Sequence, residues 1–69
     1  MRPPTATQER ILAFIRKTIE DTGEAPTVRE IAAGAGLRSP STVHYHLGRL
    51  EESGHLRHER GRHRSIRLT

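Results

Sequence analysis

The stretch TVREIAAGAGLRSPSTVHYHLGRLEES, residues 27–53, decides the fold of this chain. Its pattern predicts two helices joined by a tight turn at Gly36, which is the arrangement of a helix-turn-helix unit. Residues 27–30 have the spacing of a capping box and predict the start of the shorter helix. Ser39 and Pro40 predict the N-cap and the first residue of the second helix, expected over 39–53.

Three apolar residues set the expected rotation of this second helix. Val43, Leu47 and Leu50 recur at helical spacing and are expected to face the core. The remaining positions then face outward, and most carry short hydrogen-bonding side chains: Ser41, Thr42, His44, Tyr45, Gly48 and Arg49. An ordinary surface helix usually carries Glu and Lys there. The composition therefore favours reading of base edges in the major groove of DNA over a plain amphipathic helix.

The residues before this unit predict a scaffold helix without chemistry. Thr5 and Gln8 form a second capping box, and Gly23 is the expected end of the helix. Between them, apolar residues recur at helical spacing: Ile11, Phe14, Ile15 and Ile19. The two Ala-Gly pairs at 33–36 are interpreted as turn chemistry only.

The residues after the unit predict a two-stranded antiparallel ribbon. Residues 55–59 and 65–69 alternate in polarity, and residues 60–63 form the expected hairpin tip. The inward residues of the ribbon are Leu56, Ile66 and Leu68. The predicted fold class is therefore mostly α with a small β-ribbon, a three-helix winged helix-turn-helix in a single domain over residues 1–69.

The excess positive charge is confined to the predicted wing, residues 55–68. Residues 1–53 hold seven basic and seven acidic side chains, whereas residues 54–69 hold five arginines against Glu59 alone. A solvated tail is the simpler interpretation, but a basic segment beside a helix-turn-helix favours phosphate binding. The wing arginines taken as phosphate-binding candidates are Arg57, Arg60, Arg62 and Arg64.

Length and composition argue against most other classes. A chain of 69 residues without cysteine offers no disulfide and no cysteine-ligated zinc, and it shows no nucleophile–base pair or phosphate loop. Of the five histidines, His44 and His46 are two apart on a helix and point in different directions, and His55, His58 and His63 are interleaved with arginine, so neither a metal site nor a cofactor is expected. Neither a small-molecule substrate nor enzymatic activity is expected. The chain has no membrane-spanning run or signal peptide, so we expect a soluble, cytoplasmic, nucleoid-associated protein.

Several ordered motifs resemble the N-terminal DNA-binding domain of the LexA-type repressors, which govern the bacterial DNA-damage (SOS) response. The motifs are Thr5-x-x-Gln8, TGEAPTVREIA at 22–32, GLRSPSTVHYHLGRLEESG at 36–54 and SIRL at 65–68. The resemblance implies a three-helix bundle with a hairpin wing that binds a palindromic operator as a dimer and blocks transcription. It also implies a base-reading surface on Ser39, Ser41, Thr42, His44 and Tyr45. Phosphate contacts are assigned to Arg38, Arg49 and the wing arginines.

The chain departs from this family in two respects. Members carry a second, C-terminal domain that dimerises and cleaves its own chain with a serine–lysine pair, whereas the one lysine here, Lys17, lies on the first helix. We therefore expect either an excised DNA-binding domain or a naturally short relative. The wing is also richer in Arg and His than is usual in the family, which predicts stronger nonspecific binding.

Two alternative functions remain open from the residues alone. A winged helix can bind structured RNA, or it can serve as a protein-interaction module. Only Tyr45 offers an outward aromatic ring for stacking on RNA bases, which disfavours RNA. The arginines of the wing disfavour a protein-only role.

Overall fold

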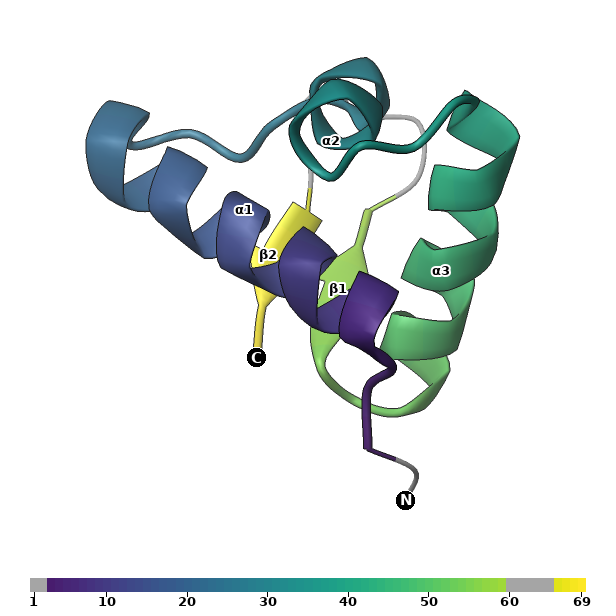
Figure 1. Cartoon of the computed structure of the whole chain (residues 1–69). Helices are drawn as coiled ribbons and strands as arrows, with labels where there is room; N and C mark the ends of the chain where they lie inside the picture. Colours follow the sequence, from purple (N-terminus) through teal and green to yellow (C-terminus); the bar gives the residue numbers. More distant parts are fainter. Residues whose placement is uncertain (1–2, 60–65) are drawn as a thin grey trace.

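The computed structural model describes residues 3–59 and 66–69. Within these ranges the chain forms α1 (Ala6–Thr22), α2 (Val28–Gly34), α3 (Pro40–Glu52), β1 (Leu56–His58) and β2 (Ile66–Leu68). Figure 1 shows α2 and α3 arranged around α1, with the short ribbon beside the end of α3. The predicted class, mostly helical with a small antiparallel ribbon, is confirmed. In the part described, no helix combines the length and the apolar character that a bilayer crossing requires.

Helix α1 begins and ends where local chemistry predicts. The Gln8 backbone N–H donates to Thr5 Oγ1 at 3.2 Å, and the Thr5 backbone N–H donates to Gln8 Oε1 at 3.1 Å. This reciprocal pair satisfies two donors that the first turn of a helix leaves without partners. Gly23 closes the helix in the left-handed region at φ 79°, and its N–H donates to the Ile19 carbonyl.

Helix α2 begins with the same capping box, in which a glutamate takes the place of the glutamine. The Glu30 N–H donates to Thr27 Oγ1 at 3.2 Å, and the Thr27 N–H donates to Glu30 Oε1 at 2.8 Å. Gly36 adopts φ 73° in the turn that follows, and the Leu37 N–H donates back to the Ala32 carbonyl at 2.8 Å. The turn therefore places a glycine, which has no Cβ, at the position that needs a positive φ.

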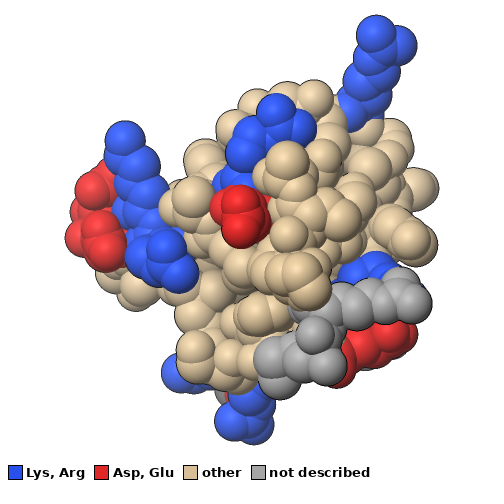
Figure 2. Space-filling model, turned by 60° about the horizontal axis from the view of Figure 1, so that its bottom comes forward, with Lys and Arg blue, Asp and Glu red and all other residues tan. Residues whose placement is uncertain are grey.

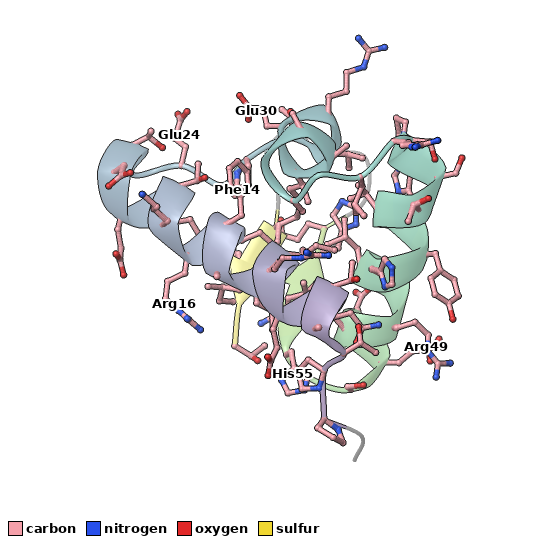
Figure 3. All side chains as sticks on the ribbon, in the orientation of Figure 1. Phe14, Arg16, Glu24, Glu30, Arg49 and His55 are labelled. Carbon is pink, nitrogen blue, oxygen red and sulfur yellow. The ribbon has the colours of Figure 1, made fainter. Side chains whose placement is uncertain are left out.

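Gly34 has a packing role that the sequence interpretation missed. The ring of Phe14 from α1 lies directly over this glycine, as the position of Phe14 between α1 and α2 in Figure 3 indicates. A Cβ added at residue 34 would overlap three atoms of the ring. The interpretation of the Ala-Gly pairs as turn chemistry alone is thus wrong for Gly34, which allows α1 and α2 to approach closely.

Helix α3 has the predicted boundaries and the predicted buried stripe. Ser39 occupies the N-cap and Pro40 the first helical position, and Ser53 caps the other end before Gly54 at φ 80°. The predicted stripe is buried: Val43, Leu47 and Leu50. These side chains join core residues from α1, α2 and the cap of α2: Ile11, Ile15, Ile31, Ala32 and Ala35.

Within the described residues the ribbon is shorter than predicted, and it packs as expected. Each strand has three residues instead of five, and the antiparallel register pairs Leu56 with Leu68 and His58 with Ile66. Leu56 and Ile66 are buried in the core, and Leu68 packs against it. The expected hairpin tip at 60–63 lies outside the described residues.

Candidate nucleic-acid interface

The residues predicted to read bases lie together on the outward side of α3 and at its cap. The buried stripe of α3 fixes the rotation of the helix, so Ser41, His44 and Tyr45 are exposed and Thr42 is half-buried. Tyr45 is 62% exposed and is the one large apolar side chain among the described residues that stands out into solvent. The structure therefore brings these candidates into one surface, whose role in base reading stays a prediction.

Ser39 caps α3 by position but not by its side chain. Its hydroxyl accepts no hydrogen bond from the backbone N–H groups of the first turn. Instead, Ser39 Oγ lies 3.2 Å from Thr42 Oγ1, and either hydroxyl can be the donor. Two predicted base-reading residues thus share one hydrogen bond, so the orientation of one hydroxyl depends on the other.

The two histidines of α3 differ in their surroundings. His44 is exposed, whereas His46 is half-buried. Tyr45 and His46 meet edge to face, with ring centroids 5.2 Å apart and planes at 72°. His46 Nδ1 also lies 3.2 Å from Gln8 Nε2 of α1. The exposed tyrosine is therefore backed by a histidine that contacts the scaffold helix.

Gln8 is a residue whose second contact the sequence interpretation missed. It is 8% exposed, and among residues 3–59 and 66–69 it is the one polar residue buried as a whole. The spacing of the capping box predicts the contact of the Gln8 side-chain oxygen with Thr5 but gives no partner for its Nε2. Only the packing of α1 against α3 brings that nitrogen to His46.

The predicted phosphate-binding arginines differ in exposure and in their contacts. Arg38 and Arg57 are exposed, on the approach to α3 and on β1. Arg49 Nη1 lies 3.8 Å from Glu52 Oε2 on the same helix, and Arg49 points outward in Figure 3. Exposed pairs of this kind contribute only about 0–1 kcal/mol, so Glu52 is a weak competitor for phosphate. Three further candidates lie outside the described residues: Arg60, Arg62 and Arg64.

The strand register adds Arg67 to the candidates. Arg57 and Arg67 are Cα partners, so both project from the outer face of the ribbon. Like charges directly opposite each other disfavour strand pairing unless a counter-charge is present. Glu59 Oε1 lies 3.8 Å from Arg67 Nε and supplies one such charge. The alternation of residues 65–69 is enough to predict that Arg67 lies on the outer face. Its partner on the other strand could not be predicted, because the register depends on the turn and on packing.

On the face shown in Figure 2, the basic side chains of the described residues do not form one continuous stripe. Figure 2 shows Lys and Arg at several separate points on the face turned forward, with acidic side chains beside some of them. This scatter agrees with the balance of seven basic and seven acidic residues over 1–53. The histidines of the described ranges contribute to no group of three His, Cys, Asp or Glu residues that would hold a metal.

Comparison with known proteins gives a consistent family. Residues 1–65 match the family model described as LexA DNA binding domain. Over 64 residues, 93% of this chain, it is 48% identical to the LexA repressor of Caldicellulosiruptor saccharolyticus, of which the match covers 32%. Over 68 residues, 99% of the chain, it is 44% identical to the LexA repressor of Staphylococcus epidermidis, with 33% of that protein covered. The chain spans about a third of the length of the curated relatives it matches.

Proposed function

We propose, because this chain belongs to the LexA DNA-binding domain family, that it recognises operator sites in double-stranded DNA and represses transcription. One observation carries the proposal. The N-terminal half of α3 is held by a buried apolar stripe while it presents uncharged polar side chains outward. The matched family is a DNA-binding module, which also supports the prediction that this part of the protein is not an enzyme.

The proposed mechanism places α3 in the major groove with its N-terminal end toward the bases. The hydroxyls of Ser39, Ser41 and Thr42 donate or accept hydrogen bonds at base edges, and the Thr42 methyl contacts a thymine methyl. His44 and Tyr45 reach base edges or phosphates next to them. The N-terminal end of the helix also carries partial positive charge, which favours its approach to the phosphate backbone.

The proposed electrostatic contribution comes mainly from arginines outside α3. We include Arg67, because its position on the ribbon surface supports a phosphate contact. The proposed set is therefore Arg38, Arg57, Arg60, Arg62, Arg64 and Arg67. If about four of these neutralise phosphates, log K should fall against log salt with a slope of about −3.6. Phosphate contacts position the protein but carry no sequence information, so this contribution is shared by all duplexes.

The proposal extends to a palindromic operator of the SOS type bound by two copies of the domain. A single α3 spans one half-site, and a two-fold operator requires two copies related by the same symmetry. The 69-residue chain alone is therefore expected to bind a half-site weakly. Its place of action in this proposal is the cytoplasm, on the chromosome.

Selection of bound sequences from random duplex DNA, with structured RNA as competitor, tests the proposal. The expected result is enrichment of a short duplex motif that RNA does not displace. A mismatch within that motif should cost about 1–3 kcal/mol of binding free energy. Enrichment of no motif, or displacement of DNA by RNA, would instead favour the RNA-binding or protein-interaction alternative.

A further inference from the structure

The Gln8 side chain uses both ends of its amide, and each end meets a different part of the fold. Gln8 Oε1 accepts from the Thr5 N–H at 3.1 Å, which completes the cap of α1. Gln8 Nε2 lies 3.2 Å from His46 Nδ1, 38 residues away on α3. Figure 1 shows the first turn of α1 lying beside α3. One buried amide therefore joins the start of the scaffold helix to the outward-reading helix.

The chemistry of the amide assigns the direction of the second hydrogen bond. An amide NH₂ group donates and does not accept, so His46 Nδ1 must be the acceptor. A neutral imidazole whose Nδ1 accepts carries its proton on Nε2. Turning the amide over would place its NH₂ against the Thr5 N–H, donor against donor, and would break the cap. The cap thus fixes the amide, and the amide fixes the His46 tautomer.

The second capping box of the chain shows that capping alone does not require an amide. Glu30 occupies the equivalent place in α2 and accepts from the Thr27 N–H at 2.8 Å. A glutamate at position 8 would cap α1 in the same way. Its second oxygen, however, cannot donate, so His46 would have to carry its proton on Nδ1 and the direction of the hydrogen bond would reverse. What distinguishes position 8 from position 30 is the contact with α3.

His46 is well placed to transmit this contact to the reading surface. It follows Tyr45 directly and meets its ring at 5.2 Å, and it lies one helical turn after Thr42. We propose that Gln8 is a positioning residue for DNA recognition, which holds α3 through His46 so that residues 39–45 present a single arrangement. This inference rests on the proposed function of α3.

The test removes the acceptor of this hydrogen bond and leaves the cap intact. His46→Phe keeps Gln8 and its bond to Thr5, keeps an aromatic ring beside Tyr45 and removes the acceptor on α3. His46→Asn is the rescue variant, because its amide oxygen lies near the position of Nδ1 and accepts from Gln8. His58→Phe is the matched control, because it makes the same exchange at a half-buried histidine of β1.

The measured quantity is the ratio of dissociation constants for a selected duplex and a scrambled duplex, taken at pH 8.5. His46→Phe is expected to reduce discrimination at least about fivefold. His46→Asn is expected to recover most of this loss, and His58→Phe is expected to stay within about twofold of the parent chain. An unchanged ratio for His46→Phe, or a His46→Asn variant that discriminates no better than His46→Phe, would overturn the positioning role.

A measurement on the parent chain keeps the proposal testable even if a variant fails to fold. Nitrogen NMR of the His46 imidazole should show a protonated Nε2 and an unprotonated Nδ1 in the neutral form. The opposite tautomer would overturn the Gln8 contact while leaving the proposed function intact. A parent chain that prefers no duplex sequence would overturn both the proposed function and the positioning role, whereas the tautomer measurement still reports on the contact itself.

Discussion

Ser39 Oγ and Thr42 Oγ1 share one hydrogen bond of 3.2 Å at the start of α3. Neither hydroxyl orients independently, because the one that donates to its neighbour has no proton left for a base. If one hydroxyl donates to a base, the hydrogen bond between the two side chains is kept only when the other hydroxyl is its donor.

The first prediction concerns this pair. Ser39→Ala and Thr42→Val should each weaken binding to the selected duplex, and the double variant should lose less than the sum. We expect a coupling free energy of at least about 0.5 kcal/mol in a double-mutant cycle on DNA affinity. Ser39→Ala combined with Ser41→Ala is the control and should be additive, since the contact of Ser39 is with Thr42. Additive losses at 39 and 42 would contradict the prediction.

The second prediction contrasts two helical glycines. Gly34→Ala should destabilise the fold by about 1–3 kcal/mol, because the added methyl group overlaps the Phe14 ring. Gly48→Ala, with nothing within 4 Å of its added Cβ, should stabilise it by up to about 1 kcal/mol through helix propensity. Urea denaturation of both variants provides the measurement. Stabilisation by Gly34→Ala would show that the ring moves aside at little cost.

The third prediction concerns the arginine pair on the ribbon. Arg57→Ala and Arg67→Ala should weaken binding to all duplexes alike, and each should reduce the magnitude of the salt slope by about 0.9 if it removes one phosphate contact. Arg16→Ala removes the same charge from α1, where Figure 3 shows the side chain pointing away from α3. A salt titration of the three variants should leave the Arg16 variant closest to the parent slope. Equal changes in all three would indicate an effect of net charge only.

The fourth prediction separates recognition from affinity. His44→Ala should change the selected motif at a position within the half-site, because a side chain that contacts a base edge discriminates by about 1–3 kcal/mol. Repeating the selection with this variant and with Arg57→Ala gives the comparison. The arginine variant should select the parent motif at lower affinity. An unchanged motif for His44→Ala would remove His44 from the base-reading set.

Local features of the fold were predictable from sequence, and contacts between helices were not. Capping boxes at 5–8 and 27–30, and the stripe beginning at Val43, depend on residues a few positions apart, so spacing alone reveals them. The contact of Phe14 with Gly34 depends on how α1 and α2 cross. The strands also end sooner than their alternating pattern suggests, since pairing is confined to three residues on each strand.

The candidate site divides in the same way. Which residues of α3 face outward followed from its buried stripe, but the partners of those residues did not. The Ser39 side chain was expected to cap the backbone, and it contacts Thr42 instead. A hydroxyl near a helix start has both choices within reach, and the pattern Ser-Pro-Ser-Thr does not distinguish them.

The separation of 38 residues between Gln8 and His46 also has a kinetic consequence. The helices carry their own start and stop signals, so their boundaries can form before the chain has closed on itself. Contacts between distant residues pay the larger loop-closure entropy and tend to form after local ones. Breaking this hydrogen bond should then accelerate unfolding and leave the folding rate nearly unchanged, a low φ-value that stopped-flow chevrons of His46→Phe would reveal. The pairing of α1 with the reading helix would be a late event of folding, and its loss in brief openings would precede global unfolding.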